Sequence, residues 1–320
     1  MMKSAFVITF IYFFTLHNSN LKLAFKRNET ISANTIVFSP DSTRLLLSLQ
    51  NKTAIIIDVA TGKSLLILNG HTDEVNTANY SPDGKFIITA SKDKTTKIWN
   101  AITGTLIHDL KDEKYNTSTA TFSPDGKRFL IVAGNSIKIY DSENATLLYT
   151  FADPSGNVFT DACFGRDNRS VYSGSTDNTV KKWVIGFDQS VLTFQKLPGM
   201  VTSVSVSPVG NYLVAASILD KMIYIYNTDR GTKLCSIPDQ TMPQKLKFSN
   251  DGNYFLAVTG SVTVSSFKEC KEIYELFDEE EFIINAAAFN PSGNNIATVS
   301  SLGTIKLWDA HTGKLLNVVN

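Results

Sequence analysis

A histidine, an aspartate and a hydroxyl side chain occur within one short stretch of the sequence, residues 70–104. They are His71, Asp93 and Thr89, and a tryptophan, Trp99, follows them. Imidazole, carboxylate and hydroxyl groups form a hydrolase triad when they converge in an open cleft. The same groups also occur as buried polar side chains that satisfy one another through hydrogen bonds.

The rest of the sequence offers little support for catalysis or for a metal site. The four histidines are scattered, and neither a Cys-x-x-Cys nor a His-x-x-x-His spacing occurs. A Gly-x-x-x-x-Gly-Lys-Ser/Thr phosphate loop and a Gly-x-Ser-x-Gly nucleophile turn are also absent. We therefore expect no enzymatic activity, no cofactor and no metal ion.

Composition indicates a folded protein whose net charge creates no strong electrostatic field. Thirty basic and thirty acidic residues cancel, so nothing favours nucleic acid or an anionic membrane surface. A hydrophobic content of 43% suits a globular protein. Cys163, Cys235 and Cys270 lie far apart and in no motif, so we expect reduced, buried thiols and a cytoplasmic location.

Alternating apolar runs, each closed by turn residues, organise the stretch around the four polar residues. These runs are Val75–Tyr80, Lys85–Ala90, Thr95–Trp99 and Leu106–Leu110. Period-2 alternation with Pro, Gly and Asp at the breaks predicts short antiparallel strands joined by tight turns. One four-stranded unit cannot bury both of its faces, so copies of it must stack to make a core.

The turn that follows the first run recurs along the chain at an almost constant spacing. Its copies begin at Ser39, Ser81, Ser123, Gly165, Ser207, Ser249 and Asn290. Successive copies are 42, 42, 42, 42, 42 and 41 residues apart. The sequence therefore predicts seven repeats of one four-stranded unit.

This pattern resembles the WD40 repeat family. The period, the Gly70-His71 pair, the Ser-Pro-Asp-Gly turns such as Ser81–Gly84 and the ending Trp308-Asp309 match that family over nearly all of residues 21–320. The resemblance implies an all-β fold, a seven-bladed β-propeller of four-stranded antiparallel blades around a central channel.

The resemblance also gives a role to the four polar residues. In the family's structural tetrad, an Asp in a tight turn accepts a hydrogen bond from a His, and the His contacts a Thr hydroxyl that meets a Trp indole N–H. His71, Thr89, Asp93 and Trp99 stand at these positions. Because all four would lie between strands of one blade and not in a cleft, the resemblance favours structure over catalysis.

The first twenty residues are set apart from the predicted propeller. Residues 1–20 form an apolar leader with one early lysine, Lys3, which resembles the start of a signal peptide. The alternative is a partial eighth repeat, because Phe14 lies seven residues before Leu21, as Trp308 lies seven before Leu315. Residues 21–320 are expected to form the propeller.

Closure of the ring has two candidate outer strands. Leu21–Phe25 lies at the right distance before the first turn to complete the last blade, as a terminus commonly does in propellers of this family. We expect this N-terminal strand to pair with the last blade. Leu315–Val319 would then lie at its edge or displace it.

The resemblance further indicates a binding face, formed by the loops between fourth and first strands and between second and third strands. The position that enters each first strand is polar in three repeats and apolar in four, in the order Ser32, Glu74, Asn116, Val158, Met200, Met242 and Ile283. Leu219 falls on the same face. We expect Val158, Met200, Leu219, Met242 and Ile283 to form a partner-binding patch. The alternative is that these side chains pack inward.

An acidic run lies beside this predicted patch. Glu279, Glu280 and Glu281 precede Ile283 in the loop that enters the seventh repeat. Such a run is usually a solvated loop, but next to apolar residues it could attract a Lys- or Arg-bearing peptide. We therefore expect partner proteins or peptides of mixed apolar and basic character.

The leading functional hypothesis is a non-enzymatic scaffold that binds partner proteins on one face of a propeller. One alternative is a secreted or periplasmic-type propeller that binds a ligand or acts as an enzyme, and another is one propeller of a larger assembly subunit. A secretory location or a membrane contact would require residues 1–20 to act as a signal or anchor.

Overall fold

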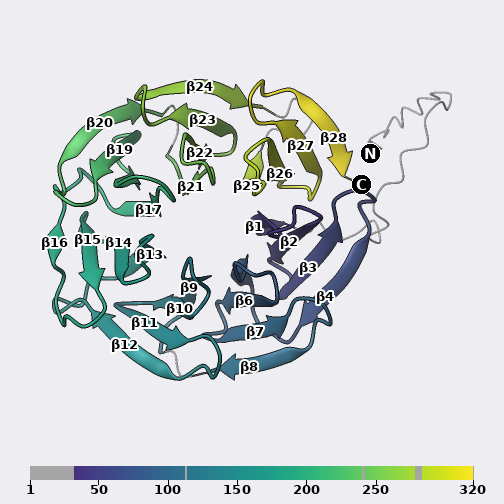
Figure 1. Cartoon of the computed structure of the whole chain (residues 1–320), viewed down its shortest axis with the longest axis horizontal. Coiled ribbons are helices and arrows are strands. Elements are labelled where there is room, and N and C mark those ends of the chain that lie inside the picture. Colours follow the sequence, from purple (N-terminus) through teal and green to yellow (C-terminus); the bar gives the residue numbers. More distant parts are fainter. Residues whose placement is uncertain (1–31, 112–113, 240–241, 278–282, 320) are drawn as a thin grey trace, which may run out of the picture.

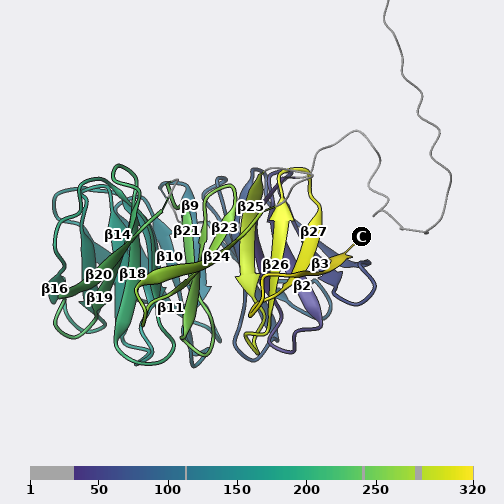
Figure 2. The same ribbon diagram turned by 90° about the horizontal axis from the view of Figure 1, so that it is seen from above.

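The computed structural model describes residues 32–111, 114–239, 242–277 and 283–319. Within these ranges the chain forms 28 β-strands and no helix. The strands make seven four-stranded antiparallel sheets, each from four consecutive strands. Figure 1 shows the sheets arranged as blades around a central opening, and Figure 2 shows the same ring from the side. The predicted seven-bladed, all-β propeller is confirmed.

The strand bounds follow the sequence repeat closely. Blades one to four contain β1 (Ala33–Phe38), β2 (Arg44–Leu49), β3 (Thr53–Asp58), β4 (Ser64–Asn69), β5 (Val75–Tyr80), β6 (Phe86–Ser91), β7 (Thr96–Asn100), β8 (Leu106–Leu110), β9 (Thr117–Phe122), β10 (Arg128–Ala133), β11 (Ser136–Asp141), β12 (Leu147–Ala152), β13 (Phe159–Phe164), β14 (Ser170–Ser175), β15 (Val180–Val184) and β16 (Leu192–Thr193). Blades five to seven contain β17 (Val201–Val206), β18 (Tyr212–Ser217), β19 (Met222–Asn227), β20 (Lys233–Pro238), β21 (Lys245–Phe248), β22 (Tyr254–Val258), β23 (Val262–Ser266), β24 (Lys271–Leu276), β25 (Ile284–Phe289), β26 (Asn295–Ser300), β27 (Ile305–Asp309) and β28 (Leu315–Val319).

The recurring turn joins the first and second strands of each blade by local hydrogen bonds. In blade two, the Ser81 hydroxyl donates to Asp83 Oδ1 at 2.6 Å and accepts from the backbone N–H of Phe86 at 2.9 Å. Gly84 has a φ of 72°, in the left-handed region that favours glycine. The Ser-Pro-Asp-Gly residues therefore determine the turn between β5 and β6 through their own hydrogen bonds and backbone conformation.

The hydrophobic core is divided into seven clusters, each shared by two neighbouring blades. Between blades one and two, for example, Leu46 and Ile56 pack with Ile87 and Trp99. One blade therefore buries its faces only against the next blade. This packing is the physical reason that the repeats occur as a closed stack.

The last blade is completed by its own fourth strand. β28 pairs with β27 in the sheet order β25-β26-β27-β28. The prediction that an N-terminal strand takes this place is wrong, because the seventh repeat supplies Leu315–Val319 directly in sequence. Blades seven and one instead share a core cluster, and Asn285 Nδ2 donates to Ser32 Oγ at 2.7 Å.

Two cysteines form a disulfide between blades five and six. Cys235 on β20 is bonded to Cys270, which directly precedes β24, and their Cα atoms are 6.4 Å apart. The prediction of three reduced thiols is wrong for this pair, although Cys163 is a free thiol. The ring places the outer parts of adjacent blades side by side, which the separation of 35 residues in sequence does not reveal.

The apolar leader, residues 1–20, and the candidate strand Leu21–Phe25 lie outside the described residues. Both interpretations of the leader therefore stay predictions. Across the described ranges, the chain holds no helix long and apolar enough to cross a membrane.

Candidate functional site

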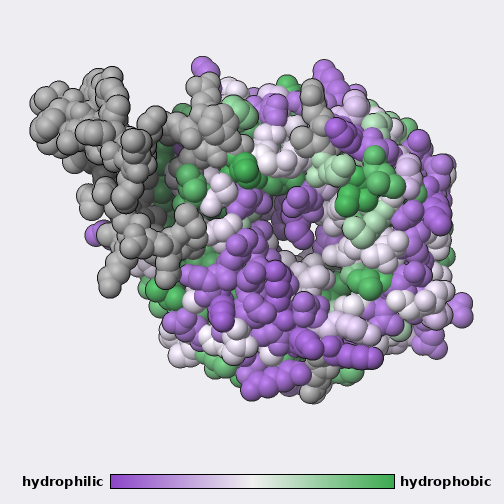
Figure 3. All heavy atoms as spheres, turned by 180° about the vertical axis from the view of Figure 1, so that it is seen from behind, coloured by the Kyte–Doolittle hydropathy of each residue, from purple (hydrophilic) through white to green (hydrophobic). Residues whose placement is uncertain are grey.

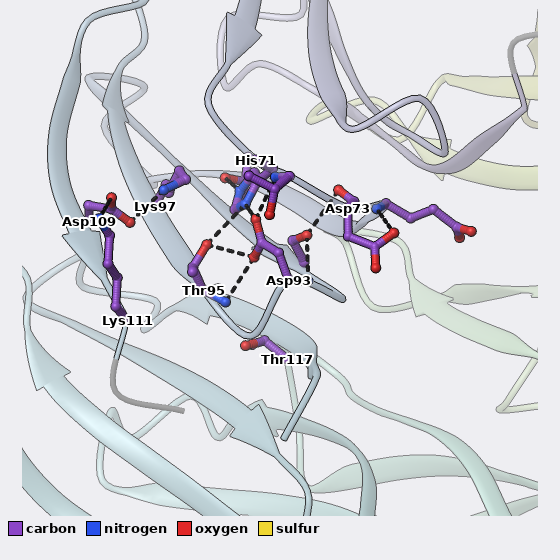
Figure 4. A network of polar contacts seen from close by, with 12 residues as sticks. His71, Asp73, Asp93, Thr95, Lys97, Asp109, Lys111 and Thr117 are labelled. Carbon is purple, nitrogen blue, oxygen red and sulfur yellow. Dashed lines mark hydrogen bonds and ion pairs between the residues drawn. The ribbon is translucent and has the colours of Figure 1, made fainter. Parts of the chain in front are cut away.

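The four residues of the predicted tetrad lie in one chain of hydrogen bonds. His71 Nδ1 is 2.9 Å from Asp93 Oδ2, and His71 Nε2 is 2.7 Å from Thr89 Oγ1. Trp99 Nε1 donates to the same Thr89 oxygen at 2.9 Å. Strands β6 and β7 carry Thr89 and Trp99, and the turn between them carries Asp93. Figure 4 shows His71, Asp93 and Thr95 pointing toward one another.

The charges of this network follow from its burial and its hydrogen bonds. Burial lowers the pKa of His71 more strongly than the hydrogen bond from its ring to Asp93 raises it, so the imidazole is neutral at pH 7. Burial alone would raise the pKa of Asp93, but hydrogen bonds from Thr95, the Thr72 N–H and His71 lower it to about 2. The imidazole therefore carries its proton on Nδ1, facing the carboxylate.

This arrangement does not suit nucleophilic catalysis. The Thr89 hydroxyl is fully buried, and it donates to His71 Nε2 while accepting from the indole of Trp99. A nucleophile must reach its substrate, whereas this oxygen has its hydrogen-bonding capacity used inside the blade. What the geometry supplies is mutual satisfaction of buried polar groups.

Two other blades keep part of the tetrad. Trp183 Nε1 donates to Ser173 Oγ at 2.9 Å, and Trp308 Nε1 donates to Thr298 Oγ1 at 2.8 Å. In blade four, Asp177 has no histidine partner among the described residues. The ammonium group of Lys181 pairs with the Asp177 carboxylate in place of a histidine.

Lys181 joins two carboxylates in blade four. Its Nζ lies 2.8 Å from Asp153 Oδ2 and 2.7 Å from Asp177 Oδ2. The Asp153 side chain is only 2% exposed, so the pair is largely removed from water. Sequence reasoning missed this triad. The available signal was Lys181 itself, because it stands at the position that Lys97 has in blade two.

The predicted binding patch is largely exposed. Val158 is 44%, Leu219 68%, Met242 45% and Ile283 52% exposed, whereas Met200 is half-buried. The alternative, in which these side chains pack inward, therefore fits only Met200, and only partly, because its side chain is half-buried.

Backbone hydrogen bonds connect the loops that carry these residues. The carbonyl of Val158 accepts from the N–H of Thr176 at 2.9 Å, and that of Met200 accepts from Ile218 at 3.1 Å. The carbonyl of Ile283 accepts from Ser301 at 2.9 Å. Each bond joins the residue before a first strand to the turn between second and third strands of the same blade. Both sets of loops therefore lie on one face of the ring.

Leu302 extends the patch and was missed from the sequence as a member. It follows Ser301, which is bonded to Ile283, and it is 59% exposed. Leu302 occupies the turn position that Asp93 has in blade two, so the loss of the tetrad carboxylate was the available signal. We call Val158, Leu219, Met242, Ile283 and Leu302 the apolar face patch.

Blades one to three are polar at the equivalent positions. Glu74 forms an ion pair with Lys92, with 2.6 Å between Oε2 and Nζ. Figure 3 shows hydrophobic surface gathered on the side of the ring that holds β13–β20, with more hydrophilic surface toward β1–β8. The acidic residues Glu279, Glu280 and Glu281 lie outside the described residues, so their relation to the patch is not observed.

Exposed apolar side chains also occur around the rim of the ring. They lie on the outer strands or directly beside them, and they include Leu65, Ile107, Leu148, Val191, Leu234, Ile273 and Leu316. These residues are spread over all seven blades, whereas the five members of the apolar face patch lie on blades four to seven. In the described loops of blades one to three on this face, Tyr115 is the exposed large hydrophobic side chain. Confinement to part of one face, and not exposure alone, distinguishes the patch.

The comparisons with known proteins agree with this architecture. The family model "WD domain, G-beta repeat" (WD40) matches residues 62–100, 145–183, 189–227 and 270–309. These four matches each span about one repeat length. Within the described ranges, no group of three or more His, Cys, Asp or Glu side chains is placed to hold a metal ion.

Several curated proteins are similar to parts of the chain. Periodic tryptophan protein 2 of Arabidopsis thaliana is 22% identical over 58% of this chain and 21% of its own length. Mitotic checkpoint protein bub3 of Dictyostelium discoideum is 23% identical over 49% of this chain and 52% of its own. Eukaryotic translation initiation factor 3 subunit I of Aspergillus terreus is 31% identical over 49% of this chain and 50% of its own. The matches thus span between about a fifth and about half of these relatives.

Proposed function

Because this chain is a seven-bladed propeller of WD40 repeats, we propose that it is a non-enzymatic scaffold that binds a partner protein or peptide on one face. The observation that carries this proposal is the apolar face patch, whose five members are each more than two-fifths exposed. An apolar cluster that stays in contact with water is a common mark of a protein interaction site.

The construction of the ring supports a scaffold role. Every blade shares a core cluster with each of its neighbours, so the loops are held on a rigid support. Rigid presentation of loops reduces the conformational entropy that binding would otherwise cost. The interaction surface is therefore prepared before a partner arrives.

The chemistry of the proposed partner follows from the patch and its neighbourhood. Apolar side chains of the partner would cover Leu219, Met242 and Leu302, and basic side chains would be attracted by Glu279–Glu281. The basic part of this proposal rests on the sequence alone. Two similar proteins, eukaryotic translation initiation factor 3 subunit I and transcription initiation factor TFIID subunit 5, are named as subunits of larger factors, which fits a scaffold within an assembly.

Affinity capture with charged substitutions tests the patch. We expect Leu219→Glu and Met242→Glu, together, to reduce recovery of wild-type partners by about tenfold or more, because each buries a carboxylate in an apolar interface. Leu148→Glu on β12 is the matched control, since Leu148 is 47% exposed but lies on the rim.

Circular dichroism and thermal unfolding must first show that all variants are folded. Equal recovery of partners by the wild type and the folded double variant would contradict the patch. If only the Leu148→Glu variant loses its partners, the binding surface is the rim of the ring and not the patch.

The disulfide favours a second candidate, a secreted ligand-binding propeller. Structural disulfides persist in oxidising compartments and are rare in the cytosol. Cys235 and Cys270 are bonded in the structure, whereas the absence of a paired motif suggested a cytoplasmic protein. Alkylation of the protein in intact cells before lysis, followed by mass spectrometry, decides between the two. A bonded pair would support secretion, and two alkylated thiols would support the cytoplasmic scaffold.

A further inference from the structure

Two lysines, Lys245 and Lys247, line the central channel of the ring. A cavity of about 300 Å³ is lined by the inner strands of all seven blades. Among its described lining residues, the charged ones are Asp161, Lys245 and Lys247. Figure 3 shows that the ring is open at its centre. The lining therefore carries one net positive charge at neutral pH.

Side chains at one repeated position normally tie each inner strand to the next. This position recurs every 42 residues, at Thr35, Thr77, Thr119, Asp161, Ser203 and Lys245. The backbone N–H of Ala78 donates to Thr35 Oγ1 at 3.3 Å, and that of Leu246 donates to Ser203 Oγ at 3.2 Å. Lysine cannot accept such a bond, so the pattern ends at Lys245.

The nearby carboxylate is already used by this pattern. Asp161 Oδ1 accepts from Thr119 Oγ1 at 3.1 Å, and Asp161 Oδ2 accepts from Ser203 Oγ at 2.8 Å and from the N–H of Val204 at 3.2 Å. Asp161 is 8% exposed and belongs to the wall. Among the described residues, no carboxylate oxygen lies within ion-pairing distance of Lys245 or Lys247.

Two ammonium groups from one strand therefore face a cavity in which no described carboxylate is bonded to either of them. Lys245 and Lys247 alternate along β21, so both side chains lie on the channel side of the strand. Lys247 lies against the channel wall although water reaches it, and desolvation there lowers the pKa of its ammonium. The charge of Asp161 partly offsets this lowering, and the charge of Lys245 adds to it. An anion between the two lysines would relieve both the repulsion and the loss of hydration.

We propose that the channel binds a small oxyanion, a phosphate or a carboxylate, between Lys245 and Lys247. Hydrogen bonds from an ammonium to an anionic oxygen are among the stronger ones in proteins. The cavity is large enough to hold such a group together with several waters, since a water occupies roughly 30 Å³ in the liquid. The oxyanion could be free in solution or be an acidic side chain of a bound peptide, because the chemistry of recognition is the same.

Titration with inorganic phosphate tests the site in the full chain. At constant ionic strength, with chloride exchanged for phosphate, we expect a saturable rise in the unfolding temperature. In the NMR spectrum, the amide signals of Leu246 and Phe248 on β21 should shift with the same dissociation constant. For Lys245→Met/Lys247→Met, we expect the affinity to fall by about tenfold or more per lysine.

The matched control is Lys85→Met/Lys127→Met, which removes the same charge from exposed turns outside the channel. A non-saturable response that is equal in both double variants would overturn the proposal. If the channel variant does not fold, the NMR titration of the wild type still decides. Phosphate-dependent amide shifts that lie outside β21, with none on β21, would overturn the proposal. A second titration with a Glu-containing peptide, with and without phosphate, distinguishes the two sources by competition.

Discussion

At the scale of single residues, the four side chains of the tetrad in blade two satisfy one another through hydrogen bonds. His71 is neutral and keeps its proton toward Asp93, and the Thr89 hydroxyl connects the imidazole to the indole of Trp99. Deleting one member leaves buried donors or acceptors unpaired, which costs about 1–3 kcal/mol for each group. The contribution of the tetrad is therefore measurable by substitution.

Removal of the carboxylate should destabilise the protein strongly. In Asp93→Ala, His71 Nδ1 and the Thr72 N–H lose their acceptor, and we expect the free energy of unfolding to fall by about 2–4 kcal/mol. Urea unfolding measures this value. Asp73→Ala is the control, because Asp73 is exposed and its carboxylate accepts from the exposed N–H of Glu74, and we expect it to cost no more than about 1 kcal/mol. Equal losses in the two variants would contradict the role of the network.

The same carboxylate should make stability depend on pH. The pKa of Asp93 is lowered to about 2, from an ordinary value of 3.8, so its contribution is present above pH 4 and is lost as the pH falls toward 2. The folded state of His71 also binds its proton less readily than the unfolded state, which destabilises the protein in the same direction.

We therefore expect the difference in unfolding free energy between wild type and Asp93→Asn to shrink by about 2 kcal/mol between pH 5 and pH 2. Urea unfolding at a series of pH values measures this difference. A difference that does not change with pH would show that Asp93 keeps an ordinary pKa in the folded protein.

At the scale of the blades, equivalent positions are stabilised by different chemistry. In blade two, Lys97 Nζ lies 2.5 Å from Asp109 Oδ1 on β8, whereas in blade four Lys181 turns to Asp153 and Asp177. The repeat therefore fixes the path of the backbone and leaves each blade to satisfy its own polar groups. Blade four does so with a nearly buried ion triad in place of a histidine.

Loss of the blade-four lysine should cost about 3 kcal/mol at pH 7. In Lys181→Met, two largely buried carboxylates lose their countercharge, and removing one partner of a buried pair is strongly destabilising. The loss should be smaller near pH 4, because protonated carboxyl groups need no cation. Lys182→Met serves as the control, since its ammonium lies over the Tyr172 ring at 5.6 Å and forms no ion pair within the described ranges. A penalty independent of pH would contradict the triad.

Blades four and five meet closely at one glycine. A Cβ on Gly174 of β14 would lie 2.5 Å from Val201 Cγ1 of β17. We expect Gly174→Ala to cost about 1–3 kcal/mol, because the added methyl group forces the two blades apart. In a thermal-unfolding double-mutant cycle, Val201→Ala should recover part of this loss. Strict additivity of the two substitutions would contradict direct contact as the cause.

At the scale of the whole molecule, closure comes from seven equivalent blade contacts and one covalent bond. Blades seven and one pack like any other pair, and among the described residues the four strands of each blade are consecutive in sequence. The Cys235–Cys270 bond adds a covalent connection between blades five and six. Unfolding of the ring is thereby restricted at one junction.

Reduction of this disulfide should lower stability. The bond closes a loop of 35 residues in sequence separation, for which the chain-entropy model gives about 3–4 kcal/mol. We expect dithiothreitol to lower the unfolding temperature of the wild type. The Cys235→Ser/Cys270→Ser variant should unfold at the reduced value and should not respond to dithiothreitol. A similar response in that variant would assign the effect to Cys163 or to the reductant.

The sequence by itself determined the number of blades and the positions of most strands. Tight turns depend on a few local residue types, such as Ser81 to Gly84, and their 42-residue period repeats that local code along the chain. The four tetrad residues were predictable for the same reason. Their positions within one repeat, and the resemblance of that repeat to a known family, were sufficient.

Only the tertiary structure decided which side chains of neighbouring blades meet. The disulfide, the outer strand of blade seven, the Lys181 triad and the placement of Leu302 beside Ile283 each depend on contacts between separate segments. Closure of the ring brings together residues that are one repeat apart, or 253 residues apart for Asn285 and Ser32. A repeat pattern specifies each blade, but the pairing across blades follows from packing of all seven at once.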